Sequence, residues 1–330
     1  MRSCQECRGL PRDAGQSRGR EKGGAALTAA LPRTLQRGFI VVAVLWILAA
    51  LAGLVLIYLT YVTNTAVVVA GSTERIQAEA MVTAGLELTA LQLSGTTEAG
   101  RPTSGTFDAR VGAGRVFVTF RSEAARIDLN VAPKALLAGL MTGLGAGASD
   151  AAGYADRILA WRAPTEQGDN DPETAFYKNS GVAYAPRHAP FPAPEELWLV
   201  YGIPPALIER MLPFVTVFSN VAQVNVHDAA PQVLAALPNM TPEMLQSVLS
   251  QRADPTADPR ALVGMTGGEG ATLAASKAYR VIVEAELPDG SRRGSEVVIL
   301  LLESGDEPYR VLSWRNNSDG STAPQRVSTR

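Results

Sequence analysis

Residues Phe39–Leu59 read FIVVAVLWILAALAGLVLIYL, a run of 21 residues without a charged side chain. A helix rises about 1.5 Å per residue, so this run is about 30 Å long, the hydrocarbon thickness of a bilayer. No charged residue occurs between Arg37 and Glu74. The run therefore predicts one membrane-spanning helix that contacts lipid over Phe39–Leu59.

Charge is distributed unevenly on the two sides of this run. Residues 1–38 contain eight basic and three acidic residues, a local charge of +5, whereas residues 39–330 contain 22 basic and 29 acidic residues, a charge of −7. Basic flanks stay on the cytoplasmic side of a membrane. We therefore expect a cytoplasmic leader over residues 1–38 and a body outside the cytoplasm.

Two other interpretations of the apolar run remain open. A cleaved signal peptide has an apolar stretch of about 7–15 residues, shorter than this one, although Val68-Val69-Ala70 is a weak cleavage site. A buried core helix is disfavoured because such helices rarely extend this far without a polar position.

The helix is predicted to continue over residues 39–93, half of it in lipid and half packed on a soluble domain. Apolar residues beyond the membrane run recur at Ile76, Ala80, Ala84, Leu88 and Leu91. Polar residues 74–79 mark a wetter face, which is the pattern of an amphipathic helix. The segment that follows, Ser94-Gly95-Thr96-Thr97, indicates the end of the helix.

Strand patterns occur on both sides of a long helical region. Residues 105–130 alternate in polarity, and residues 279–287 and 295–303 flank the hairpin signal Pro288-Asp289-Gly290-Ser291. We predict an α+β fold with an antiparallel sheet built from residues 94–130 and 276–315. Residues 131–275 are predicted to form an inserted all-α domain, and residues 316–330 a loose polar tail.

The helical region contains an internal repeat. Residues 127–140 (IDLNVAPKALLAGL) align without gaps with residues 224–237 (VNVHDAAPQVLAAL), and the later helices at 158–163 and 248–253 also agree. Each copy predicts a strand ending in an Asn or Asp turn and then two helices, a helix-hairpin-helix or SAM-like unit. A third helix pair is expected over residues 195–212.

Such units also occur in membrane-anchored DNA-binding proteins, which is the alternative function. Those units bind phosphate through a glycine-rich hairpin that exposes backbone N–H groups. The hairpin here, Leu237–Pro242, contains no glycine, and the body is acidic. We therefore expect packing modules and no nucleic-acid partner.

Catalytic motifs are scarce. Cys4-x-x-Cys7 has no second ligand pair. The two histidines, His188 and His227, accompany no phosphate loop, nucleophile elbow or metal pair. His227 occupies the position of Asn130 in the repeat, which favours a turn-forming role. We predict that the chain is not an enzyme, so a secreted hydrolase is disfavoured.

Together these features resemble the K-type minor pseudopilin of type II secretion systems, general secretion pathway protein K, from about Arg37 to Glu303. Arg37-Gly38-Phe39 looks like a prepilin peptidase site with cleavage after Gly38. The pattern Ile-Asx-Leu/Val-Asn-x-Ala-Pro is like that of the family and occurs at Ile127–Pro133. The leader is longer than the usual short basic stretch of the family.

The resemblance implies a subunit at the tip of a periplasmic filament that helps to export folded proteins across the outer membrane. It implies a single pass through the bacterial inner membrane, with the body in the periplasm. The implied partners are the I- and J-type minor pseudopilins, which would contact the exposed part of the helix around Ile76–Leu91, the prepilin peptidase and the inner-membrane secretion platform.

Ala43, the fifth residue after the expected cleavage, marks the tip position. Most pilin-like subunits carry Glu there, and its negative charge pairs with the N-terminal amine of a neighbouring subunit within the bilayer. A subunit at the tip has no neighbour above it and therefore no such amine to pair with, so it can lack the Glu.

Four residues in one loop form a candidate calcium site: Asp169, Asn170, Asp171 and Glu173. Hard cations prefer such oxygen ligands, and calcium in the helical region is a property of the resembled family. The spacing is not that of an EF-hand. A solvated acidic loop remains the alternative.

Overall fold

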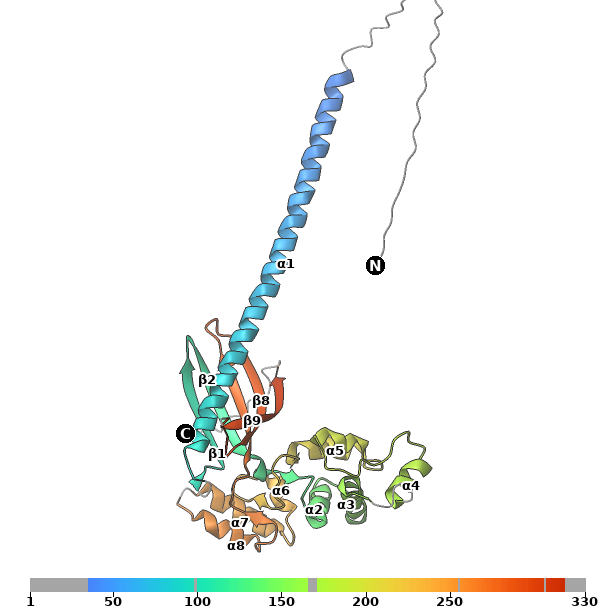
Figure 1. The fold of residues 1–330 in the computed structure, drawn as a ribbon, viewed down its shortest axis with the longest axis vertical. Helices are drawn as coiled ribbons and strands as arrows, with labels where there is room; N and C mark the ends of the chain where they lie inside the picture. Colours follow the sequence, from blue (N-terminus) through green and yellow to red (C-terminus); the bar gives the residue numbers. More distant parts are fainter. Residues whose placement is uncertain (1–34, 98–99, 166–170, 255, 306, 318–330) are drawn as a thin grey trace, which may run out of the picture. The chain divides into compact units, whose positions relative to one another are not determined.

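The structure is a computed structural model that describes residues 35–97, 100–165, 171–254, 256–305 and 307–317 (Figure 1). The chain divides into two compact units, Met1–Val68 and Val69–Arg330. Helix α1 (Leu35–Ser94) extends from the first unit into the second. It ends at Ser94, as its sequence indicates.

The first unit contains the apolar part of α1. Phe39–Tyr61 is a helical stretch long and apolar enough to cross a membrane, and none of its most apolar window is buried inside the protein. Large side chains such as Trp46 and Ile57 are mostly exposed. Its length and composition fit a single membrane anchor.

The second unit contains a five-stranded antiparallel sheet with the order β1-β2-β7-β8-β9. The strands are β1 (Ser104–Val111), β2 (Gly114–Ser122), β7 (Ala278–Glu286), β8 (Arg292–Leu301) and β9 (Tyr309–Asn317). The predicted antiparallel sheet and its β7–β8 hairpin are confirmed. The pairing of β2 with β7 joins segments from the two sides of the helical region.

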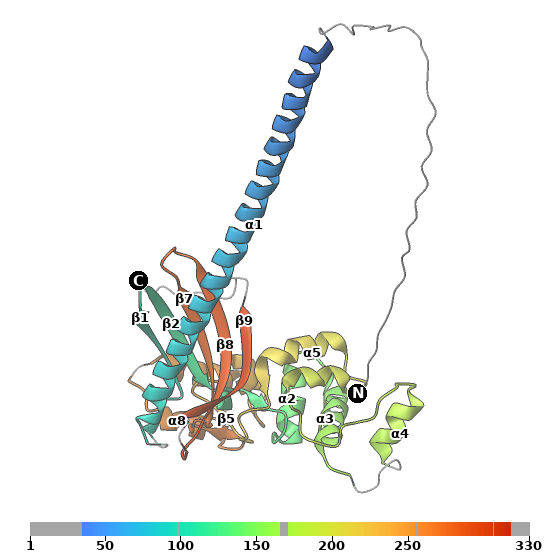
Figure 2. The same ribbon diagram turned by 45° about the horizontal axis from the view of Figure 1, so that its top comes forward.

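The C-terminal part of α1 packs on one face of this sheet (Figures 1 and 2). Met81, Val82 and Leu86 are buried there in one cluster with alternate residues of β2, β7 and β8. A Cβ on Gly85 would come 2.9 Å from Val283 Cγ1, so the missing side chain lets the helix approach β7 closely. This apolar layer is the core of the sheet domain.

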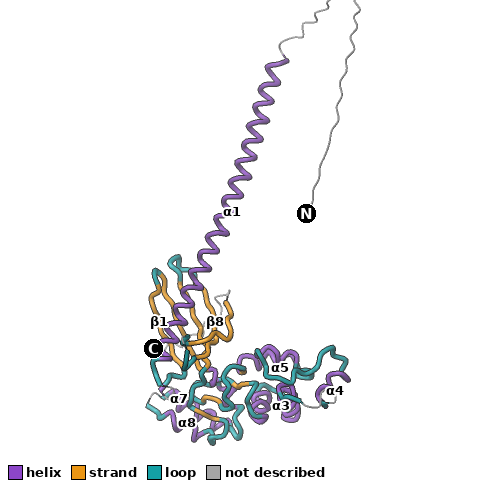
Figure 3. The backbone as a smooth tube through the Cα atoms, in the orientation of Figure 1, coloured by secondary structure: helices purple, strands orange, loops and turns teal. Residues whose placement is uncertain are grey.

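Short helices and two-residue strands make up the helical region between β2 and β7 (Figure 3). In chain order they are η2 (Glu123–Ala125), β3 (Ile127–Asp128), α2 (Lys134–Gly143), α3 (Ala148–Arg162), α4 (Pro172–Asn179), η4 (Pro194–Leu199), α5 (Pro205–Met211), η5 (Leu212–Phe214), β4 (Val215–Thr216), β5 (Val224–Asn225), α6 (Pro231–Ala235), α7 (Pro242–Ala253), α8 (Pro259–Met265) and β6 (Ala271–Thr272). β3 pairs in parallel with β4, and β5 with β6. The region therefore mixes helices with short strand pairs around a core of its own.

The repeated sequences make matching hydrogen bonds. After β3, the amide of Asn130 donates to Asp128 Oδ1 (2.8 Å), and after β5 the amide of His227 donates to Asn225 Oδ1 (2.9 Å). In both copies the turn therefore closes on a short polar side chain, a known turn-forming arrangement.

A second match lies between the helices and the turns. Arg162 at the end of α3 donates to the carbonyl oxygen of Ala132 (2.8 Å), and Arg252 at the end of α7 donates to that of Ala229 (2.9 Å). Burial lowers the pKa of both guanidinium groups, and a nearby carboxylate, Asp128 or Asp228, opposes this shift. Each arginine thus holds its helix on the preceding turn.

Candidate functional site

Helix α1 carries a second apolar face that points away from the sheet. At 100° per residue, Ala80, Ala84 and Leu91 lie about 120–180° from the buried residues Val82 and Leu86. The exposed fractions are 67% for Ile76 and 70% for Leu91. We call the residues Ile76, Ala80, Ala84, Leu88 and Leu91 the outward stripe. A helix that is apolar on both sides needs cover on both sides.

The expected cleavage site lies in the first turn of α1. Arg37, Gly38 and Phe39 are all helical, and the side chains of residues 35–38 are not among those that the structure describes. Ala43 lies one turn further along the same helix. The expected cleavage site and Ala43 therefore lie on the same helix, at the start of its apolar stretch.

Two of the four candidate calcium ligands belong to the start of α4. Asp171 is its N-cap and accepts a hydrogen bond from the Thr174 amide (3.0 Å). Glu173 Oε1 is buried without a hydrogen-bond partner, 3.6 Å from Arg157 Nη1, and burial raises the pKa of this carboxyl. Asp169 and Asn170 lie outside the described residues.

The structure also shows a charged cluster that sequence reasoning missed. Glu123 is 1% exposed, and its carboxylate receives two hydrogen bonds from the Arg280 guanidinium, 2.7 and 3.1 Å long. Arg280 also pairs with Glu296, and burial lowers the pKa of the neighbouring Arg126 to about 10. These residues are far apart in sequence, so no local pattern could have revealed the cluster.

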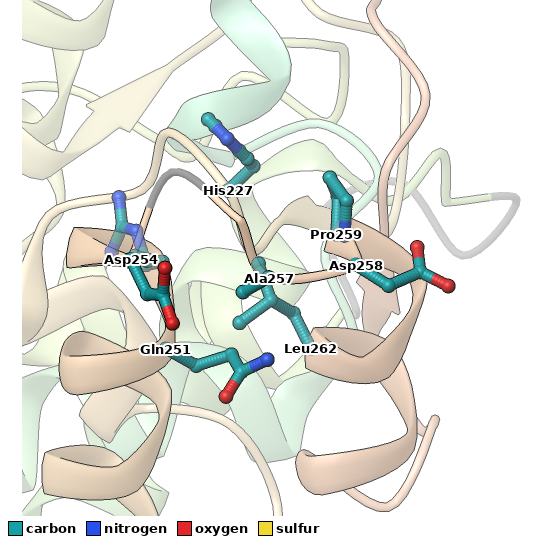
Figure 4. Close-up of a pocket in the computed structure, with 8 residues that line it drawn as sticks. His227, Gln251, Asp254, Ala257, Asp258, Pro259 and Leu262 are labelled. Carbon is teal, nitrogen blue, oxygen red and sulfur yellow. The ribbon is translucent and has the colours of Figure 1, made fainter.

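A small pocket lies beside the second copy of the repeat (Figure 4). Its volume is about 30 Å³, and it is lined by His227, Gln251, Arg252, Asp254, Ala257, Asp258, Pro259 and Leu262. Pockets for small-molecule ligands are usually about ten times larger or more. This pocket has room for about one water molecule, so it offers no binding site for a substrate.

Part of this chain is similar to a known protein family. The family model for type II secretion system protein K matches residues 121–220, from the end of β2 to the loop before the second copy of the repeat. Over these residues the chain is similar to type II secretion protein K. No curated protein matches it.

A solved structure has a similar fold. The chain resembles a chain in the crystal structure of the GspK-GspI-GspJ complex from the enterotoxigenic Escherichia coli type 2 secretion system. The TM-score is 0.52 at 18% sequence identity, with coverage of 76% of this chain and 99% of that chain. At this identity the likeness concerns the fold.

The family match and the fold both support a minor pseudopilin role. Neither finding supports the membrane-anchored DNA-binding alternative. Among the described residues, no group of three His, Cys, Asp or Glu is placed to hold a metal ion.

Proposed function

We propose that this minor pseudopilin caps the tip of the periplasmic filament and that the outward stripe is the surface on which I- and J-type minor pseudopilins pack. The exposure of the stripe carries the proposal. Ile76 and Leu91 stand two-thirds exposed on a helix whose other face is already buried. Apolar surface left in water on one helix face marks a protein contact.

The composition of the stripe suits a neighbouring helix. Ala80 and Ala84 lie between the larger Ile76 and Leu88, so a second helix could approach closely over the alanines. The solved relative is a complex of three type 2 secretion proteins, which supports a partner of the same class.

The proposal is tested with paired substitutions on α1. The double variant Ile76→Asp and Leu91→Asp should weaken co-purification of the full-length chain with I- and J-type subunits by more than tenfold, which is about 1.4 kcal/mol or more. Its melting temperature should stay near the wild-type value, because both residues are exposed.

Two controls make this result specific. Arg75→Asp changes charge at an exposed position on the far side of the same helix from the outward stripe and should leave assembly unchanged. Leu93→Ala, at a fully buried position, should cost about 2–5 kcal/mol of stability. A complex of the double variant that forms at wild-type affinity would refute the outward stripe as the contact surface.

We further propose that the segment between β2 and β7 is one inserted module of repeated helix-hairpin-helix-like units. The matching turns and arginine contacts of the two copies support this view. A bulky module of this kind would obstruct a subunit stacked above it. Together with Ala43, which gives no charge partner to such a subunit, it favours the end of the filament.

Processing and membrane insertion complete the proposal. Prepilin peptidase would cleave after Gly38, and Phe39–Leu59 would then anchor the mature chain in the inner membrane with its body in the periplasm. The inner-membrane secretion platform would bind this anchored form. The apolar stretch at the start of α1 and the basic residues before it support this orientation.

Calcium is a second proposal, and it rests on Glu173. A buried carboxylate oxygen without a hydrogen-bond partner calls for a missing ligand or water. A calcium ion held by Glu173, Asp171 and the oxygen atoms of Asp169 and Asn170 would supply that partner. Arg157, 3.6 Å from Glu173, competes for the same carboxylate and would weaken binding.

A further inference from the structure

The chain enters and leaves the helical region at one place. Ser122 Oγ at the end of β2 lies 3.0 Å from Ser276 Oγ just before β7, and Ser122 Oγ also accepts a hydrogen bond from the Ser276 amide (2.8 Å). Two adjacent crossings would form a natural hinge, because a body attached at a single place can rotate about it.

Side-chain contacts beside the crossing oppose such rotation. The buried Glu123 follows the first crossing, and one of its oxygens accepts a hydrogen bond from the hydroxyl of Thr216 in β4. The same carboxylate is held by Arg280 in β7, which also pairs with Glu296 in β8. Glu123 therefore links the middle of the sheet to a strand of the helical region.

Two further contacts lie at the opposite edges of the sheet. At the β1 edge, the Ser104 hydroxyl donates to Asp228 Oδ1 in the second copy of the repeat (2.7 Å), and Asp228 is 8% exposed. At the β9 edge, Arg315 pairs with Glu195 in η4. Since β1 and β9 are the outermost strands, any rotation about the crossing would stretch at least one of these contacts.

We infer that the sheet and the helical region are locked into one rigid body by contacts at both edges and in the middle, with Glu123 as the central positioning residue. The central contact is the least accessible of the three, because Arg280 and Glu123 side chains are 11% and 1% exposed. Opening it would leave a buried charge without its partners, which proteins avoid. The Arg315–Glu195 pair is half exposed and contributes less.

The inference is tested by distances between spin labels on the full-length chain in lipid nanodiscs, with Cys4 and Cys7 replaced by serine. Labels at Thr106→Cys in β1 and Gln246→Cys in α7 report the sheet and the helical region. The wild type should give one narrow distance distribution. Thr216→Val, combined with Ser104→Ala and Glu195→Gln, should at least double its width.

A conservative variant separates positioning from general stability. Thr216→Ser keeps the hydroxyl that reaches Glu123 and should keep the narrow distribution, whereas Thr216→Val alone should widen it. Melting temperatures of both variants are measured alongside. A broad wild-type distribution, or equal widths for the serine and valine variants and the triple variant, would overturn the inference even if the melting temperatures differ.

Discussion

Gly139 and Ala236 occupy the same position in the two copies of the repeat and meet between α2 and α6. A Cβ on Gly139 would come 2.3 Å from the carbonyl oxygen of Ala236. The absence of a side chain at Gly139 is therefore what allows the two copies to pack this closely.

Adding one methyl group at Gly139 should disrupt this packing. We expect Gly139→Ala to destabilise the protein by about 1–3 kcal/mol, because the backbone of α6 must move. Gly153 in α3 is the matched control, since it is also within a helix and a Cβ there meets nothing within 4 Å. Gly153→Ala should stabilise by about 0.5–1 kcal/mol. Urea unfolding measures both, and equal effects would contradict the close approach.

Gly38 is the residue on which processing is expected to depend. Replacing it with a bulky side chain such as leucine should leave the full-length precursor in the membrane, because a peptidase site needs room beside the scissile bond. The mass of the membrane-bound protein gives the result, with Phe39 expected as the first residue of the wild type. Mature protein of normal mass from the Gly38→Leu variant would end the argument for this cleavage site.

At the scale of elements, α1 shows which structural features sequence patterns can predict. Its length, its end and its apolar first half follow from the sequence. The regular stripe from Ile76 to Leu91 is easily recognised, yet it points outward, and the less regular set Met81, Val82 and Leu86 packs on the sheet. Periodicity reveals that a helix has an apolar face, whereas the strands that meet it, far away in sequence, decide which face they cover.

The first turn of α4 allows a clean test of calcium binding. Calcium should raise the melting temperature of the wild type through mass action, by RT ln(1 + [Ca]/Kd). Asp171→Asn should abolish this rise but keep the basal stability, since asparagine caps a helix as well as aspartate does. A wild-type melting temperature that does not change from chelator to millimolar calcium would eliminate the site, whatever the behaviour of the variant.

At the scale of the whole molecule, the sequence indicates the order of sheet, helices and sheet but not how they are joined. The repeat and the hairpin of β7 and β8 are local patterns, so they can be read directly. The Glu123–Arg280–Glu296 cluster combines residues separated by up to 173 positions in the sequence. Such contacts depend on tertiary packing, and the spacing of residues along the sequence does not predict them.

The nearness of Ser122 and Ser276 has a consequence for the order of folding. Closing a loop of 154 residues costs roughly 2.4 kcal/mol more chain entropy than closing one of about ten residues. If the helical region folds first, its own structure brings the two ends together, and β2 can pair with β7 without that cost. We therefore expect amides of α2, α3 and α7 to gain protection in pulse-labelled hydrogen exchange before those of β2 and β7.

Simultaneous protection, or earlier protection of β2 and β7, would contradict this order. If it holds, the biosynthesis of the protein has a vulnerable interval. The anchor and α1 emerge from the ribosome early, while strands β7 to β9 emerge last. During that interval both apolar faces of the part of α1 that follows the apolar stretch lack their cover. The folding time of the helical region therefore sets how long a chaperone must shield the nascent helix from aggregation.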